Sequence, residues 1–253
     1  MKLPMSAIPA RAVYLLLLLC LSACSACQAQ QENAGAAVYT SKVPRPGGIG
    51  KVYMGREIAG IMGAGGGAWL ERSTRQEEEN VAAAIEAMQL SPESVVADIG
   101  AGTGYYTFRI APEVPEGKVY AVEVQDAFIA ALKSRKKELG YNQVEVVKGG
   151  SQTLHVPDGS LDLAVMVDVY HELEYPVEML QAIHKALKPD GRLLLLEYRA
   201  EDPSIPIKEL HKMSVSQANR EMSANGFRLY RRADFLPMQH FLLYEKAEGE
   251  GAN

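Results

Sequence analysis

The sequence predicts an α/β fold in which a mostly parallel, seven-stranded sheet carries helices on both faces and an antiparallel strand at one edge. From Ser91 onward, short β-branched segments alternate with longer segments of helical periodicity. Several of the short segments are apolar almost throughout, which is typical of parallel strands covered on both faces. The chain of 253 residues is 47% hydrophobic and 23% charged, which indicates a globular protein rather than a disordered or fibrous one.

Seven segments have the composition of strands. The first five are separated by helical segments, which favours parallel pairing, whereas the last two have only a short connection and are expected to form an antiparallel pair at the sheet edge. The predicted strands are Val95–Ile99, Lys118–Val124, Val144–Val147, Leu161–Val167, Arg192–Tyr198, Phe227–Arg232 and Met238–Glu245.

Five segments have helical periodicity or helix boundary signals. The first of them, within a predicted N-terminal helical cap over residues 51–90, should cover the sheet of the main domain, residues 91–247. Lys188-Pro189-Asp190-Gly191 is expected to end the fourth helix and to turn the chain into the next strand. The predicted helices are Arg75–Leu90, Tyr106–Ala111, Asp126–Leu139, Val177–Leu187 and Ser214–Ala224.

The first 23 residues are interpreted as a signal peptide. Two positive charges precede the apolar segment Ala12–Leu21, which has about half of the roughly 20 residues that a membrane-spanning helix needs. Leu21-Ser22-Ala23-Cys24 resembles the lipobox of bacterial lipoproteins, in which cleavage leaves a lipidated cysteine; ordinary signal cleavage nearby is the alternative. Ser25 after this cysteine favours the outer membrane, so we expect an exported lipoprotein on the periplasmic side. Residues 24–50 are predicted to be a flexible tether.

Charge and cysteine content exclude several classes of partner. The 26 basic and 31 acidic residues leave a net charge of −5 without a basic block, which disfavours a nucleic-acid binder and favours a small-molecule partner. Cys20, Cys24 and Cys27 are the only cysteines, so the rest of the chain can form neither a disulfide nor a thiolate metal site. We therefore expect no metal site, and the sequence does not indicate an oligomeric state.

The segment from Asp98 to Tyr105 is the strongest functional motif. An acid near the end of a buried strand is followed by Gly100, Gly102 and Gly104, which allow the backbone to approach a ligand closely. A dinucleotide fingerprint would need glycine where Tyr105 stands. A phosphate-binding loop would need a lysine followed by a serine or threonine after the glycine-rich segment 60–67, and both are lacking.

This spacing resembles motif I of class I S-adenosylmethionine-dependent methyltransferases, which have a Rossmann-like fold. The resemblance covers roughly residues 75–200 and implies S-adenosylmethionine as the cofactor. It implies that Asp98 and the three motif glycines form the cofactor turn and that Glu123 accepts hydrogen bonds from both ribose hydroxyls. The acid that holds adenine in the family is replaced by Gly150, so backbone amides around Ser151 and Gln152 are expected to take that role.

Ionisable residues after the fourth strand are the candidate catalytic groups. His171 could accept a proton from the methyl acceptor, and Asp168 could orient either His171 or the substrate. Residues before the core and before the last helix could also contact the acceptor, although packing or solvated positions are equally good interpretations; they are Tyr53, Arg56, Trp69, Arg72, His211, Lys212 and Met213. His240 alternates with apolar neighbours and is interpreted as structural.

Two functional hypotheses follow from these patterns. One is a methyltransferase acting on a small molecule, which the joint presence of Asp98, the glycines and Glu123 favours. The other is a lipid-anchored binding protein that keeps the pocket without catalysis, which Gly150 favours. The predicted signal peptide conflicts with the first hypothesis, because it would export a domain whose cofactor is made in the cytoplasm.

Overall fold

The computed structural model describes residues 38–247, and the elements discussed below lie in a unit that begins at Ser41. Strand β1 (Tyr39–Ser41) crosses the start of that unit. The predicted signal peptide, the candidate lipidation site Cys24 and the first part of the predicted tether lie outside the described residues. Within residues 38–247, no helix has the length and apolar composition needed to cross a membrane.

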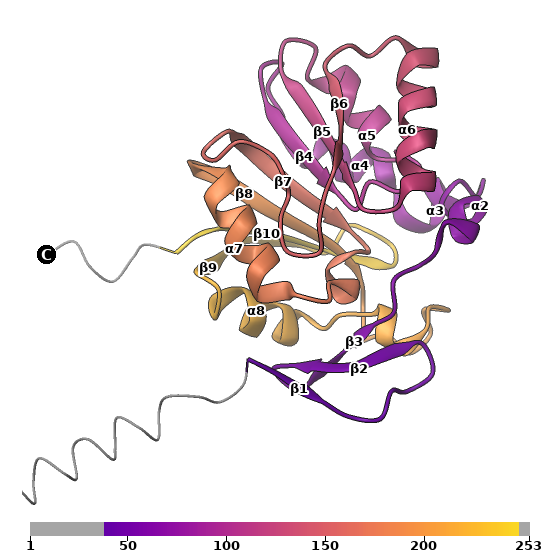
Figure 1. Cartoon of the computed structure of the whole chain (residues 1–253), viewed down its shortest axis with the longest axis vertical. Helices are drawn as coiled ribbons and strands as arrows, with labels where there is room; N and C mark the ends of the chain where they lie inside the picture. The colour runs from indigo at the N-terminus through magenta and orange to yellow at the C-terminus, as the bar shows by residue number, and fades with distance from the viewer. Residues whose placement is uncertain (1–37, 248–253) are drawn as a thin grey trace, which may run out of the picture. The chain divides into compact units, whose positions relative to one another are not determined.

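The main sheet has seven strands in the order β6-β5-β4-β7-β8-β10-β9 (Figure 1). Neighbouring strands from β6 to β8 are parallel, and β10 pairs antiparallel with both β8 and β9. This arrangement confirms the predicted fold class. The strands are β4 (Val95–Ile99), β5 (Lys118–Glu123), β6 (Val144–Lys148), β7 (Leu161–Val167), β8 (Leu187–Tyr198), β9 (Phe227–Ala233) and β10 (Gln239–Lys246).

Helices cover both faces of this sheet because successive strand residues point to opposite sides. One apolar cluster joins Val96 of β4 to α4, α5 and Leu132 of α6, and the other joins Ala97 of β4 to α7 and α8. The helices are α2 (Gly67–Leu70), α3 (Arg75–Glu79), α4 (Val81–Glu86), α5 (Thr107–Ile110), α6 (Asp126–Leu139), α7 (Pro176–Ala186) and α8 (Val215–Ser223). Short 3₁₀ turns are η1 (Ala64–Gly66), η2 (Ala111–Glu113), η3 (Tyr170–Glu172) and η4 (Glu209–His211).

The region before the core differs from the sequence prediction. Antiparallel strands β2 (Gly48–Tyr53) and β3 (Arg56–Ala59) occupy the end of the predicted tether and the start of the predicted helical cap. Buried Glu57 of β3 holds the chain before β2 in place. Its carboxylate accepts a hydrogen bond from the Arg45 amide and forms ion pairs with Lys42 and Arg45. Because polar contacts of this kind produce no hydrophobic periodicity in the sequence, the hairpin was not predicted.

Two further differences concern element boundaries. The helix expected over Arg75–Leu90 is divided into α3 and α4 at Asn80, whose φ of 50° is left-handed and therefore ends a right-handed helix. The turn expected at Lys188–Gly191 is a bulge within β8, since Leu187 pairs with Leu161 and Arg192 already pairs with Leu163.

Four acidic residues lie at or just after the carboxyl ends of four neighbouring parallel strands. In sheet order they are Glu123 of β5, Asp98 of β4, Asp168 after β7 and Glu197 of β8. The chain direction of the crossovers reverses between β4 and β7, which is the switch point where open α/β sheets bind ligands. The fold therefore brings these acids to one edge of the sheet.

Candidate functional site

A cavity of about 1020 Å³ lies at this edge of the sheet. It is bounded by Gly100 and Gly102 after β4, Glu123 of β5, Val167 of β7 and Tyr198 of β8. Its volume is at the upper end of the range of small-molecule sites.

The glycine loop after β4 is tied to the end of β5 by Glu123. The Gly102 amide donates a hydrogen bond of 2.8 Å to Oε2, while the amides of Val124 and Gln125 donate to Oε1 at 2.7 and 2.8 Å. A carboxylate has about four acceptor positions, so one on Oε2 is left for a ligand hydroxyl. Glu123 thus orders the loop, lines the cavity and keeps one acceptor position unused among the described residues.

Asp98 and Gly104 belong to the loop but do not line the cavity. Asp98 is buried and accepts a hydrogen bond of 2.6 Å from the Thr107 hydroxyl, which holds the start of α5 against β4. Burial raises the pKa of Asp98 to about 6, and the hydrogen bonds from Thr107 offset part of this shift. Gly104 packs against Phe108 and Leu132. Both residues support the loop rather than the cavity wall.

The segment after β6 contributes less than expected. Ser151 lines the cavity together with Gly150, whereas Gln152 is exposed and does not. The Gly150 amide donates to the Thr153 carbonyl at 2.8 Å, so this amide is already paired within the turn. Of the residues predicted to contact adenine, the structure brings only Ser151 to the wall.

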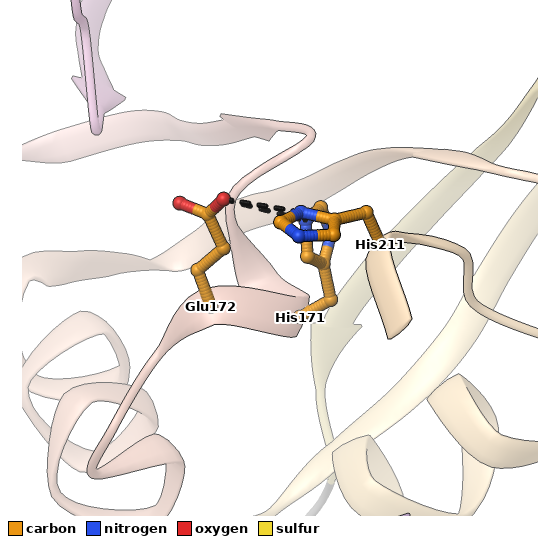
Figure 2. A group of neighbouring side chains, drawn as sticks. All are labelled: His171, Glu172 and His211. Atoms are coloured by element: carbon orange, nitrogen blue, oxygen red, sulfur yellow. Dashed lines mark hydrogen bonds and ion pairs between the residues drawn. The ribbon is translucent and has the colours of Figure 1, made fainter. Parts of the chain in front are cut away.

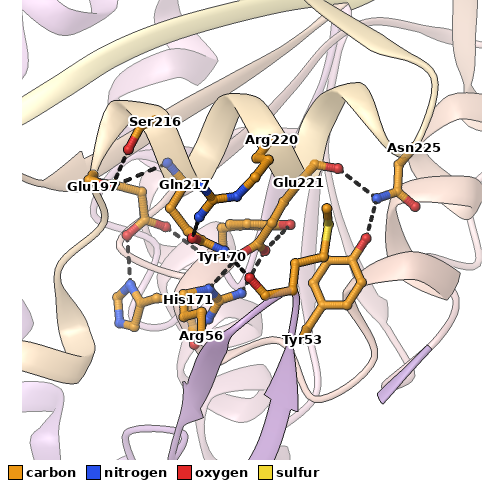
Figure 3. A network of polar contacts seen from close by, with 12 residues as sticks. Tyr53, Arg56, Tyr170, His171, Glu197, Ser216, Gln217, Arg220, Glu221 and Asn225 are labelled. Carbon is orange, nitrogen blue, oxygen red and sulfur yellow. Dashed lines mark hydrogen bonds and ion pairs between the residues drawn. The ribbon is translucent and has the colours of Figure 1, made fainter. Parts of the chain in front are cut away.

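His171 lies in η3 and also lines the cavity, and its ring is oriented by a buried carboxylate (Figure 3). Its Nδ1 lies 2.6 Å from Oε2 of Glu197, and the Tyr170 amide donates to Oε1 of the same carboxylate at 2.8 Å. An ionised Glu197 only accepts, so Nδ1 then carries the proton and Nε2, which lies 3.1 Å from Nδ1 of His211, is the acceptor atom of the ring. The guanidinium of Arg56 also donates to the His171 carbonyl.

Glu197, not Asp168, is therefore the carboxylate that orients His171. Asp168 lines the cavity, and its Oδ2 accepts a hydrogen bond of 2.8 Å from Gln239, while its buried Oδ1 has no partner among the described residues. Burial, with repulsion from Glu79 and Glu197, raises the pKa of Asp168 well above its ordinary value. Glu197 was missed although it is an acid at the end of a buried apolar strand, the same signal that identified Glu123.

Two other side chains converge on Nε2 of His171 (Figure 2). Nδ1 of His211, in η4, lies 3.1 Å from this atom, and Oε1 of Glu172 lies 3.3 Å from Nδ1 of His211. All three residues line the cavity. Glu172 was not predicted as a site residue, since only the fold brings η3 and η4 together.

The remaining candidates divide between the cavity and its supports. Trp69 lines the cavity beside Tyr198, and the Arg72 guanidinium lies 4.0 Å from the centre of the Trp69 ring. Residues that support neighbouring elements without lining the cavity are Tyr53, Arg56, Arg72, Lys212 and Met213. His240 is buried and contacts Glu201 away from the cavity, in agreement with a structural role.

The motif region also matches a known protein family. Residues 97–193 match the family described as a methyltransferase domain. This segment of the chain is therefore similar to a methyltransferase domain. It includes β4 to β7, α7 and the start of β8, and so contributes the glycine loop, Glu123 and His171.

Relatives of the methyltransferase domain are distant. An uncharacterized methyltransferase of Bacillus subtilis is 26% identical over 64% of this chain and 65% of its own length. A ubiquinone/menaquinone biosynthesis C-methyltransferase of Pasteurella multocida is 26% identical over 54% of this chain and 52% of its own. The chain thus matches about half to two thirds of the length of these relatives.

A SAM-dependent methyltransferase from Aquifex aeolicus has the same fold. Its crystal structure aligns with a TM-score of 0.68 at 23% identity over 73% of this chain and 98% of that one. The methyltransferase domain and its fold imply S-adenosylmethionine as the cofactor. The residues present fit this cofactor, because the cavity is large enough and Glu123 retains an acceptor position at its wall.

Proposed function

We propose that the protein is an S-adenosylmethionine-dependent methyltransferase that methylates a small-molecule acceptor. The observation that carries this proposal is a single cavity lined by two differently equipped groups of residues. Gly102 after β4 and Glu123 of β5 form the first group, here called the cofactor end, and His171, Glu172 and His211 form the second, here called the acceptor end. One end suits a nucleoside and the other suits an acceptor that must lose a proton.

The cofactor end is supported by the hydrogen bonds of Glu123. The free acceptor position of Oε2 would receive a ribose hydroxyl, and the amides of Gly102, Val124 and Gln125 hold the carboxylate in place. When bound, S-adenosylmethionine supplies an electrophilic methyl group. The side chain of Glu123 thus serves binding and orientation rather than chemistry.

At the acceptor end, His171 is the candidate base. Its Nε2 would take a proton from the acceptor, and Glu197 would stabilise the resulting imidazolium through its 2.6 Å contact with Nδ1. Methyl transfer is an in-line displacement, so holding the acceptor in line and excluding water supply much of the rate. The fold provides this through the walls of the cavity.

The walls indicate an acceptor with an apolar part. Ile61, Met62, Leu173 and Ile207 line the cavity, and apolar walls of this kind bind apolar portions of small ligands. The quinone biosynthesis methyltransferase among the relatives is consistent with such an acceptor. We propose a small molecule with an apolar body and one ionisable group.

Calorimetry on the full chain tests the cofactor end. S-adenosylmethionine should bind, and Glu123→Ala should weaken binding by about 1.5–3 kcal/mol, the range for hydrogen bonds to charged groups. Glu145→Ala is the matched control, because Glu145 is an exposed acid on the neighbouring strand β6. Absence of heat at millimolar cofactor would contradict the proposal.

Isotope transfer tests the reaction. Labelled methyl groups should pass from S-adenosylmethionine into the small-molecule fraction of a cell extract, and His171→Ala should abolish this transfer while leaving cofactor binding unchanged. Cofactor binding without transfer to any fraction would favour the alternative, a binding protein that keeps the pocket without catalysis. Label in nucleic acid or protein would contradict a small-molecule acceptor.

The location is proposed from the sequence, since the leader lies outside the described residues. We propose that Cys24 becomes the lipidated N-terminus of an exported protein anchored at the periplasmic side of the outer membrane. Its acyl chains would contribute about 0.8 kcal/mol per buried CH₂. Cys24→Ala should move the protein from the membrane fraction to the soluble fraction, and unchanged sedimentation would contradict lipidation.

A further inference from the structure

The side chains of His171, Glu172 and His211 form a constellation with the dimensions of a metal site (Figure 2). The three nearest atoms are Nε2 of His171, Nδ1 of His211 and Oε1 of Glu172. Their separations are 3.1 Å between the two nitrogens, 3.3 Å from Nδ1 to Oε1 and 3.8 Å from Nε2 to Oε1.

These separations fit a first-row divalent ion. A point equidistant from the three atoms lies about 2.0 Å from each, as follows from the 3.1, 3.3 and 3.8 Å sides of the triangle. Zinc binds histidine nitrogen at about 2.0–2.1 Å and carboxylate oxygen at about 2.0–2.2 Å. An ion slightly above the plane of the three atoms would therefore need little rearrangement of these side chains.

Two of the three ligands, His171 and Glu172, are oriented by a second contact, as metal ligands commonly are, while the backbone of the third is held in a closed turn. Glu197 holds Nδ1 of His171 at 2.6 Å, which favours the tautomer whose lone pair is on Nε2, the atom that contacts Nδ1 of His211. The Met62 amide lies 3.2 Å from each oxygen of Glu172. His211 lies in η4, a short turn closed by a backbone hydrogen bond from the His211 amide to the Lys208 carbonyl.

The local charge also calls for a cation. Glu79 and Glu221 are buried acids paired with arginines, but among residues 38–247 no Lys or Arg forms an ion pair with Glu172 or Glu197. Glu197 is buried and Glu172 is partly buried, and the only candidate cations beside them in the described part of the chain are the imidazoles of His171 and His211, which are neutral when they bind a metal. Two neutral imidazoles and one carboxylate would leave a net positive charge on a bound divalent ion, which Glu197 next to His171 would partly balance.

The ligand set selects the class of ion. Magnesium and calcium prefer oxygen ligands, whereas two imidazoles with one carboxylate are typical of zinc and of other first-row transition metals. The side chain of His171 is only 2% exposed, whereas those of Glu172 and His211 are 12% and 20% exposed, and all three line the cavity. Three protein ligands would leave a further position open toward that cavity, the arrangement of reactive rather than purely structural sites.

We propose that His171, Glu172 and His211 bind a divalent transition-metal ion, with zinc as the reference ion, at the acceptor end of the cavity. The ion would hold an acceptor oxygen or nitrogen and lower its pKa, so that the acceptor's proton would pass to water, and His171 Nε2 would then serve as a metal ligand instead of the proton acceptor. This role rests on the proposed methyl transfer, whereas binding of the ion does not. The sequence-based prediction of no metal site would then be wrong, because it considered only thiolate ligands and not histidine and carboxylate ligands.

Metal binding is tested on the full chain carrying Cys20→Ser, Cys24→Ser and Cys27→Ser, so that thiolates do not compete. After chelator treatment and dialysis, Zn²⁺ is titrated against a chromophoric competitor, and bound metal is counted by elemental analysis. We expect one Zn²⁺ per chain. Co²⁺ should give visible d–d absorption bands without thiolate charge-transfer bands, and added Zn²⁺ should abolish them.

Ligand variants localise the site. His211→Ala removes a ligand and should weaken Zn²⁺ binding at least about 100-fold. Glu197→Gln should weaken it about 10–100-fold, as is usual when the hydrogen-bond partner of a metal-bound histidine is changed. His155→Asn is the matched control, because His155 is exposed, has a φ of 57° that asparagine tolerates and lies outside the cavity. Circular dichroism checks that each variant is folded.

Two results would overturn the metal proposal. They are binding of less than one Zn²⁺ per chain, and equal affinities of the His211→Ala and His155→Asn proteins. All these measurements are made without S-adenosylmethionine. A protein that binds zinc but not the cofactor would therefore refute the proposed methyltransferase function and leave the metal site standing, while the reverse result would refute only the metal site.

Discussion

The main-chain amide of Gly102 donates a hydrogen bond of 2.8 Å to Oε2 of Glu123. This contact joins the loop after β4 to the end of the neighbouring strand β5, and its donor and acceptor both line the cavity. The loop conformation and the carboxylate orientation therefore depend on each other. A change at either residue should affect the stability of the loop as well as ligand binding.

Glu123→Gln should destabilise the protein even without a ligand. An amide has only one acceptor oxygen, so its NH₂ group must face at least one of the amide donors that Glu123 accepts. We expect the free energy of unfolding to fall by about 1–3 kcal/mol, measured by urea denaturation. Glu145→Gln serves as the control, and an equal loss in both variants would contradict the role of Glu123 in ordering the loop.

Gly102→Ala and Gly104→Ala should separate binding from stability. Gly102 has a φ of 55°, and an added Cβ would lie 2.9 Å from the end of the Leu70 side chain, which can move. Left-handed backbone costs about 1–2 kcal/mol for alanine. Because Gly102 lines the cavity, its variant should also bind S-adenosylmethionine more weakly in calorimetry.

Gly104→Ala should be the more destabilising of the two and should affect binding less directly. Its φ is 84°, and an added Cβ would lie 2.5 Å from Phe108 and 2.7 Å from Leu132, both buried. Overpacking adds about 1–3 kcal/mol to the backbone strain. Thermal denaturation of both variants measures this, and a Gly104→Ala protein as stable as Gly102→Ala would contradict the packing argument.

The ion pair between Arg56 and Glu221 should contribute strongly to stability. Glu221 is fully buried, pairs with the Arg56 guanidinium at 2.8 and 2.9 Å and accepts a hydrogen bond from the Tyr170 hydroxyl (Figure 3). Glu221→Gln leaves a buried guanidinium without its counter-charge, at a cost of about 3–5 kcal/mol.

The control for this variant is an exposed ion pair. Lys118 and Glu145 lie 3.0 Å apart with side chains 42% and 53% exposed, so Glu145→Gln should cost at most about 1 kcal/mol. Urea denaturation of both variants checks the difference. Similar losses would mean that the Arg56 charge finds another partner or reaches water.

Asp98 should make stability depend on pH in the direction opposite to that of most acids. Burial raises its folded-state pKa to about 6 from the 3.8 of the unfolded chain. Between these values the folded state binds more protons, so the free energy of unfolding falls as pH rises.

Asp98→Asn should remove this dependence. Relative to the unsubstituted protein, the variant should gain about 2 kcal/mol between about pH 4 and about pH 7, measured by urea denaturation at a series of pH values. Thr107→Val offers a second check, because losing the hydroxyl that bonds to Asp98 should raise the pKa of Asp98 further. Parallel curves for Asp98→Asn and the unsubstituted protein would contradict a raised pKa.

Local patterns were sufficient for most of the sheet. β4, β7 and α6 have the predicted bounds, because each combines a local period with clear boundary residues. The hairpin of β2 and β3 was not predicted, since it depends on Glu57 and its ion pairs rather than on periodicity. The division of the predicted helix into α3 and α4 was also not predicted, because the left-handed backbone of Asn80 lies within a sequence that has helical periodicity.

The sequence by itself determined the α/β fold and the strands whose ends carry Asp98, Glu123 and Asp168, because strand and loop patterns are encoded by neighbouring residues. Only the tertiary structure decided that Glu197 rather than Asp168 orients His171, and that His211 meets His171 and Glu172. These contacts join residues 26 and 40 positions apart. They depend on strand register and on the packing of η3 against η4, which no local period specifies.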